Sequence, residues 1–101
     1  MVPDVLIRLV RMTIQVEDVE TFLILFDQSS AKIRAFDGCL HLELWQDANQ
    51  SNVFTTYSHW TDREALDAYR RSELFVATWT EVKALFAARP EAHSFTRIQR
   101  L

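Results

Sequence analysis

The 101-residue sequence has few of the residues that mark linkers, disulfides and membrane spans. It contains one glycine, Gly38, two prolines, and no low-complexity tract or internal repeat, so we expect a single domain over residues 1–101. Its one cysteine, Cys39, excludes an internal disulfide and a cysteine-based zinc site, and it favours a reducing, cytoplasmic environment. The longest apolar run, residues 22–26, is far shorter than the roughly 18 residues that a membrane span requires.

The sequence also lacks an excess of positive charge. Eleven Lys and Arg residues stand against fourteen Asp and Glu residues, which gives a net charge of -3. We therefore expect no nucleic-acid partner and no binding to an anionic membrane surface. Asp4, Arg8 and Arg11 interrupt the apolar start of the chain, so we expect no secretion signal. A hydrophobic content of 49% with 25% charged residues is typical of a folded globular domain.

Alternating apolar residues predict four strands. The first covers residues 5–16, with Leu6, Met12 and Val16 on one face, and the next two cover residues 39–46 and 53–60. The polar segment between those two makes them a hairpin. The last strand is expected from His93 to Leu101.

Helical spacing of apolar residues predicts two helical regions between these strands. The first is expected to begin at Asp18 as its cap and to end at Gly38. The second opens on a capping box formed by Thr61 and Glu64 and restarts at Ser72. In the restarted piece the apolar residues on one face are Phe75, Trp79, Val82 and Phe86, and Pro90 follows.

The order β-α-β-β-α-β predicts an α+β, ferredoxin-like fold, in which one face of a four-stranded antiparallel sheet carries the helices. The other face would then expose apolar side chains, among them Ile7, Leu9, Tyr57 and Phe95. A face of this kind has to be covered. We expect a homodimer in which two copies stack sheet against sheet.

The hairpin register decides which side chains face the helices. If Leu40 pairs with Trp60, then Leu42 pairs with Ser58 and Leu44 with Thr56. The helix side then receives Phe54, Thr56, Ser58 and Trp60, and the opposite side receives His41, Glu43, Trp45, Thr55, Tyr57 and His59. A slip of one residue would exchange the two sets.

Four segments resemble the antibiotic biosynthesis monooxygenase domain: residues 7–13 (IRLVRMT), 33–46 (IRAFDGCLHLELWQ), 57–75 (YSHWTDREALDAYRRSELF) and 87–92 (AARPEA). The resemblance covers nearly the whole chain. It implies a dimeric α+β barrel with a pocket between the sheet and the helices of each subunit. Members include cofactor-independent oxygenases of quinols and polyketide phenols, haem-degrading enzymes, and many small proteins without a known activity, so membership fixes the architecture better than the reaction.

The sequence departs from two branches of this family. In the polyketide-oxidising branch an Asn lies four residues before the tryptophan that matches Trp60, and a Tyr lies six residues after it. Here those positions are Thr56 and Leu66. In the haem-degrading branch the axial His falls at Trp79 and a strand Asn at Val10. Without an imidazole at that helical position, the resemblance does not favour haem degradation.

Trp60 and Tyr69 are the candidate catalytic residues. The resemblance places Trp60 at the mouth of the pocket, where an indole can stack on an aromatic substrate or donate its N–H group, although it can equally fill the core. Tyr69 can orient a phenolic substrate by a hydrogen bond. The candidate substrate-binding residues are Thr56, Ser58, Leu66, Phe75, Trp79 and Met12.

Histidine and arginine side chains leave alternatives open. His41 and His59 can form a base, a metal pair or a haem site, but opposed histidines near Glu43 more often form a satisfied polar patch in a dimer interface. Arg8 and Arg97 are predicted within strands, where a buried cation needs an acidic partner or an anionic ligand. Each can hold a substrate carboxylate or form a salt bridge between subunits.

The resemblance implies a cofactor-independent monooxygenase that acts on a small aromatic or quinol-type compound. No metal-binding or nucleotide-binding motif is visible, so we expect no cofactor and no metal, and the substrate itself would supply electrons to oxygen. The alternatives are a non-catalytic dimer that binds a small hydrophobic metabolite and, less favoured, a haem-binding protein. Two or more hydrogen-bond donors converging on the pocket would favour catalysis, whereas an apolar cavity with only Trp60 as polar lining would favour binding.

Overall fold

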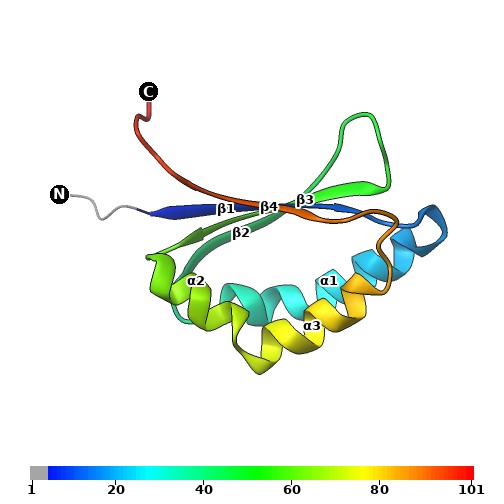
Figure 1. Cartoon of the computed structure of the whole chain (residues 1–101), viewed down its shortest axis with the longest axis horizontal. Coiled ribbons are helices and arrows are strands. Elements are labelled where there is room, and N and C mark those ends of the chain that lie inside the picture. Colours follow the sequence, from blue (N-terminus) through cyan, green and yellow to red (C-terminus); the bar gives the residue numbers. More distant parts are fainter. Residues whose placement is uncertain (1–4) are drawn as a thin grey trace.

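A computed structural model describes residues 5–101 and shows one antiparallel four-stranded sheet with its helices on one side (Figure 1). The strands lie in the order β2-β3-β1-β4. Their bounds are β1 Leu6–Thr13, β2 Cys39–Gln46, β3 Val53–Trp60 and β4 Glu91–Thr96. The helices are a 3₁₀ turn η1 Val16–Asp18, then α1 Val19–Arg34, α2 Arg63–Arg70 and α3 Glu73–Lys83. The predicted α+β, ferredoxin-like fold is confirmed, with the second helical region divided between α2 and α3.

Strands β1 and β4 are shorter than predicted. Strand β1 ends at Thr13 because the chain then turns toward the end of α3, where the backbone N–H of Gln15 donates to the Leu85 carbonyl at 2.9 Å. Val16 is therefore 72% exposed and not on the buried face. Strand β4 begins before His93 and ends at Thr96, which pairs with Leu6 at the end of β1.

Two predictions for the last strand are corrected by this pairing. His93, predicted as the first residue of the strand, lies in the middle of β4, which begins at Glu91, and is exposed. Arg97 lies beyond the strand, because the described part of β1 offers no partner past Leu6. Arg97 is exposed at the surface.

The helix caps agree with the sequence only in part. Ser72 caps α3 as predicted, and its hydroxyl accepts a hydrogen bond from the Phe75 backbone N–H at 3.1 Å. The predicted Thr61 cap of α2 is wrong, because Asp62 accepts from the Ala65 backbone N–H at 2.8 Å. Asp18 occupies the N-cap position of α1 but makes no side-chain capping bond.

Gly38 allows the turn from α1 into β2. Its φ of 91° lies in the left-handed region, which glycine adopts at little cost. A Cβ atom at this position would lie 2.4 Å from the Ala65 Cβ, so α2 packs directly against the Gly38 backbone. The Thr61 backbone N–H also donates to the Gly38 carbonyl at 2.9 Å, which joins the end of β3 to this turn.

The hairpin register is confirmed except at its first pair. Cys39, not Leu40, pairs with Trp60, and a bulge lies between Cys39 and His41. Leu40 is 44% exposed as the extra residue. Beyond the bulge, Leu42 pairs with Ser58 and Leu44 with Thr56, as predicted.

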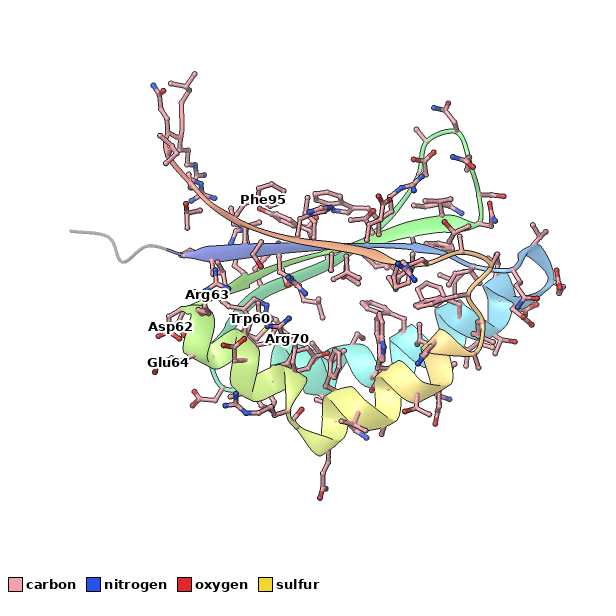
Figure 2. The ribbon with its side chains drawn as sticks, viewed as in Figure 1. Trp60, Asp62, Arg63, Glu64, Arg70 and Phe95 are labelled. Carbon is pink, nitrogen blue, oxygen red and sulfur yellow. The ribbon has the colours of Figure 1, made fainter. Side chains whose placement is uncertain are left out.

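The space between sheet and helices contains two separate clusters of buried side chains. One cluster consists of Met12, Ile14, Phe22, Phe54 and Val82, and the other consists of Leu6, Cys39, Trp60 and Leu66. On the other side of the sheet, Phe95 projects away from the helices, whereas Trp60 and Arg70 lie on the helix side (Figure 2). No helix of the described residues is both long and apolar enough to cross a membrane.

Candidate functional site

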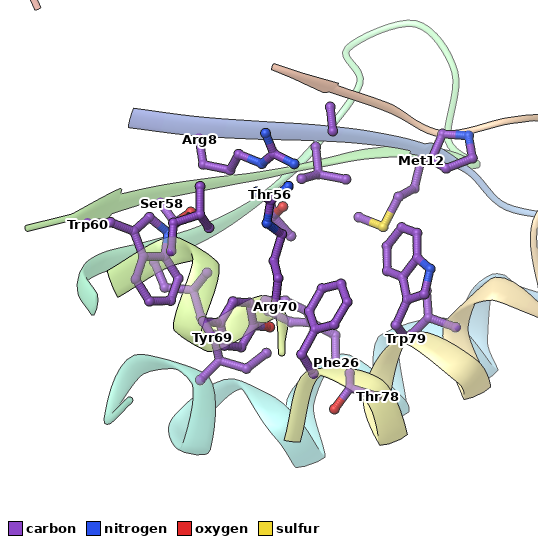
Figure 3. A pocket seen from close by; sticks show the side chains of 18 of the residues that line it. Arg8, Met12, Phe26, Thr56, Ser58, Trp60, Tyr69, Arg70, Thr78 and Trp79 are labelled. Atoms are coloured by element: carbon purple, nitrogen blue, oxygen red, sulfur yellow. The ribbon is translucent and has the colours of Figure 1, made fainter. Parts of the chain in front are cut away.

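A cavity of about 310 Å³ lies between the sheet and the helices, and side chains of both buried clusters line it (Figure 3). This volume is at the lower end of the roughly 300–1,000 Å³ that is usual for small-molecule pockets. Every residue that the sequence analysis proposed for the site lines this cavity: Met12, Thr56, Ser58, Trp60, Leu66, Tyr69, Phe75 and Trp79. Strands β1 and β3 and helices α2 and α3 supply them.

Trp60 forms one wall of the cavity and is only 1% exposed. Its indole N–H donates to the Ser58 hydroxyl oxygen at 3.0 Å, because alternate residues of β3 point to the same side of the sheet. Its ring stacks on Tyr69, with centroids 4.9 Å apart and planes at 26°. The indole N–H is thus engaged within the protein, and Tyr69 covers one face of the ring.

Among the described residues, Tyr69 is the acidic side chain that lines the cavity. Burial, with a further contribution from Cys39, raises the pKa of its phenol to about 12. The hydroxyl makes no hydrogen bond within residues 5–101, although the ring contacts Phe36 and Phe75 edge-on. Tyr69 therefore stays protonated at neutral pH and can donate a hydrogen bond to a ligand, but it cannot act as a base there.

Aromatic rings continue from Tyr69 along α3. Phe75 and Trp79 are stacked, with centroids 5.7 Å apart and planes at 12°, and Trp79 meets Phe86 edge-on at 5.4 Å. The expectation that Phe86 belongs to this helix is wrong, because α3 ends at Lys83. Phe86 instead forms an isolated β-bridge with Ile14, the residue that follows β1. The resulting wall suits flat aromatic molecules.

Two arginines also line the cavity. Arg8 points to the helix side of β1, and its Nη1 donates to the Ser94 hydroxyl oxygen at 2.9 Å. Arg70 extends from the end of α2, where it pairs with Asp67 at 2.6 Å. Arg8 is recognisable from the sequence, whereas Arg70 is not, because the Asp67–Arg70 spacing is typical of an exposed helical ion pair. Only the packing of α2 on the sheet brings Arg70 to the cavity.

The paired histidines lie on the opposite face of the sheet from this cavity. The His41 and His59 rings are 5.2 Å apart, and the Tyr57 hydroxyl shares a hydrogen bond with His59. The Glu43 carboxylate accepts hydrogen bonds from His41 and Trp45, and these bonds lower its pKa. Burial, followed by the charge of His41, lowers the pKa of His59. These groups satisfy one another and do not reach the cavity.

Within residues 5–101, no three side chains of His, Cys, Asp or Glu gather closely enough to hold a metal ion. Cys39 is buried, and burial raises the pKa of its thiol, so the thiol is not activated as a nucleophile. The polar groups of the cavity are therefore hydroxyl and guanidinium hydrogen-bond donors, and the rest of its lining is apolar and aromatic.

Comparison with known proteins gives a family match. The model of the family described as antibiotic biosynthesis monooxygenase matches residues 5–81, which is more than half of the chain. The match includes most of the segments on which the resemblance in the sequence rests. No curated protein matches the sequence.

Several solved structures have the same fold. SnoaB, a cofactor-independent oxygenase from Streptomyces nogalater, is 22% identical, with a TM-score of 0.86 and coverage of 97% of each chain. PA3566 from Pseudomonas aeruginosa is 24% identical, with a TM-score of 0.84 and coverage of 95% of this chain and 96% of the other. A conserved protein from Methanosarcina mazei Go1 is 17% identical, with a TM-score of 0.88 and coverage of 92% of each chain. At these identities the likeness shows the fold alone.

Proposed function

The chain belongs to the antibiotic biosynthesis monooxygenase family, and from this premise we propose that it oxygenates a small aromatic or quinol-type compound without a cofactor. The observation that carries the proposal is the cavity, where hydroxyl and guanidinium donors converge on an aromatic chamber. Catalysis requires hydrogen-bond donors that converge on the substrate, whereas storage of an apolar molecule does not. The description of SnoaB as a cofactor-independent oxygenase supports this reaction class.

In such a reaction the substrate supplies all of the electrons. A ring CH₂ group next to a phenol or ketone loses a proton to water or buffer, since the described residues that line the cavity include no carboxylate or imidazole, and gives an enolate or phenolate. This anion reduces O₂. One oxygen atom replaces the two hydrogens as a carbonyl, and the other leaves as water, so that R₂CH₂ and O₂ give R₂CO and H₂O. The protein then has to stabilise the anion and exclude bulk water.

The cavity supplies suitable donors for that anion. Tyr69, which stays protonated at neutral pH, presents an O–H group that has no partner within residues 5–101. The Ser58 hydroxyl accepts from Trp60 and keeps its own proton free to donate, and Thr56 lies on the same face two residues before it. The stacked rings of Phe75 and Trp79 on α3 provide a surface on which a flat substrate can stack.

Oxygen consumption tests this proposal. With anthrone as substrate, and with the rate in buffer alone subtracted, the wild-type protein is expected to consume one O₂ for each anthraquinone formed. Tyr69→Phe removes one hydroxyl and is expected to lower kcat about 100- to 1,000-fold, because one donor to the oxyanion is lost. Tyr57→Phe is the matched control, since it removes the other tyrosine hydroxyl on the opposite face of the sheet and should leave kcat unchanged.

Two outcomes would contradict the proposal. One is that no quinol or anthrone is consumed above the protein-free rate by the wild-type protein. The other is that Tyr69→Phe and Tyr57→Phe keep equal rates. Binding of the same compounds without turnover would instead favour the non-catalytic binding protein.

We also propose that the protein works as a homodimer whose subunits meet through the helix-free face of the sheet. That face exposes Trp45, at 42%, and Phe95, at 47%, and it also carries the partly buried Ile7 and Leu9. Apolar and aromatic groups gathered in this way are typical of an interface. Light scattering on a gel-filtration column is expected to give twice the chain mass of 11.8 kDa, and a mass of one chain at micromolar concentration would contradict this proposal.

A further inference from the structure

Arg8 is a cation inside the cavity without an acidic partner. It is partly buried on the helix side of β1, and its one described hydrogen bond goes to the neutral hydroxyl of Ser94. The ion pairs of residues 5–101 join Arg11 to Glu91, His41 to Glu43 and Arg70 to Asp67, so none of them includes Arg8. A partly buried guanidinium of this kind calls for an anion.

The charges around Arg8 do not supply one. Burial lowers the pKa of Arg8, and the positive charges of Arg70 and Arg63 lower it further. The one carboxylate that acts in the other direction, Asp67, is already bound to Arg70. The carboxylate that acts on Arg8 is thus already paired, and it leaves the charge of Arg8 without a partner among the described residues.

Hydroxyl groups flank Arg8 on the sheet surface. In the register of the sheet, Arg8 lies between Ser94 of β4 and Ser58 of β3, and neighbours in register share one face. The guanidinium and the two hydroxyls therefore form a short polar row across the sheet, and the next row contains Val10 and Thr56. Such a row can bind the end of an elongated aromatic molecule while its rings lie on the apolar part.

We propose that the cavity selects aromatic substrates that carry a carboxylate, and that Arg8 binds this group with help from Arg70. A carboxylate fits because it is planar and accepts two hydrogen bonds from the fork of one guanidinium. It also neutralises charge that the apolar surroundings leave uncompensated. The inference rests on the proposed function and extends it, since it states what the aromatic compound must carry besides its oxidisable ring.

Calorimetric titration of three matched ligands tests this inference. The probes are 6-hydroxy-2-naphthoate, its neutral amide, and 6-hydroxynaphthalene-2-sulfonate, which has the same ring and a tetrahedral monoanion. The wild-type protein at pH 7 is expected to bind the carboxylate about 10- to 100-fold more tightly than the amide, which is the range for hydrogen bonds to charged groups. It is also expected to bind the carboxylate more tightly than the sulfonate.

Two arginine variants assign the preference to Arg8. Arg8→Met keeps an unbranched side chain without the charge and is expected to reduce the preference for the carboxylate to below about threefold. Arg11→Met is the matched control, because Arg11 is on the same strand but on the opposite face, paired with Glu91. It is expected to keep the full preference. The comparison of ligands on the wild-type protein needs no variant, so the inference stays testable if Arg8→Met does not fold.

The possible results of these titrations can be told apart. Equal affinity for the carboxylate and the amide would overturn the inference while leaving the proposed function intact. Tighter binding of the sulfonate would overturn the choice of a carboxylate, and an undiminished preference in Arg8→Met would overturn the role of Arg8. If none of the three naphthols binds, the cavity is not a site for aromatic phenols, and the proposed function fails as well.

Discussion

The hydrogen bond between Trp60 and Ser58 determines whether this tryptophan can act on a substrate directly. Trp60 is 1% exposed and Ser58 is 6% exposed, and their bond of 3.0 Å is the only one that the indole N–H makes within the described residues. If this bond contributes to stability, the two side chains act as a unit. We predict that substitutions at the two positions are not additive.

The magnitudes follow from burial. Ser58→Ala leaves a buried indole N–H without an acceptor, which is expected to lower the free energy of unfolding by about 1–3 kcal/mol. Trp60→Phe removes the donor and part of a buried ring that stacks on Tyr69, so we expect a loss of about 2–4 kcal/mol. The double variant should lose less than the sum of the two, by about 1 kcal/mol, because the bond can be lost only once.

Urea denaturation followed by circular dichroism measures these free energies, since the loss of a tryptophan disturbs fluorescence. All four proteins are compared at one protein concentration, because association of subunits would make stability depend on concentration. Additivity within about 0.3 kcal/mol would refute the reasoning. The indole N–H would then be free to act on a ligand.

Three further predictions concern Tyr69 and the segments that position it. The raised pKa of Tyr69, about 12, stabilises the fold below pH 10, and this stabilisation should be lost as the pH rises through 12. Relative to Tyr69→Phe, the wild-type protein should therefore lose about 2–3 kcal/mol over this range in urea titrations, and parallel curves would contradict the buried phenol. Gly38→Ala should cost more than about 2 kcal/mol in the same assay, because its φ is 91° and its new Cβ meets that of Ala65. Adding Ala65→Gly should restore part of the loss, and no recovery would argue against this contact. Ser72→Ala removes the α3 cap and should lower the free energy of unfolding by about 1 kcal/mol, whereas an unchanged value would mean that the cap is dispensable.

The sequence predicts the sheet well because burial imposes a period of two on its strands. The alternation in β3 places Thr56, Ser58 and Trp60 on one side, and this side faces the helices as predicted. The bulge at Leu40 was not predicted, because inserting one residue between Cys39 and His41 leaves the alternation of the following residues intact. The ends of β1 and β4 depend on tertiary pairing that the local pattern does not contain.

The site was predicted less completely on its polar side. Apolar and aromatic residues at helical spacing, such as Phe75 and Trp79, already indicate an inner wall. Arg70 gives no such signal, because a long charged side chain at a helix end looks like a solvated one in sequence. The Asp62 cap was missed for a related reason, since Thr61 and Asp62 are both good caps and only the backbone geometry distinguishes them.

The three tryptophans of the chain allow one direct test of where an aromatic ligand binds. Trp60 and Trp79 line the cavity, whereas Trp45 lies on the helix-free face beside Tyr57. In a ¹⁵N–¹H correlation spectrum recorded during titration with 6-hydroxy-2-naphthoate, the indole resonances of Trp60 and Trp79 are expected to shift while that of Trp45 stays in place. A shift of Trp45 alone, or of none of the three, would contradict the claim that this cavity is the functional site.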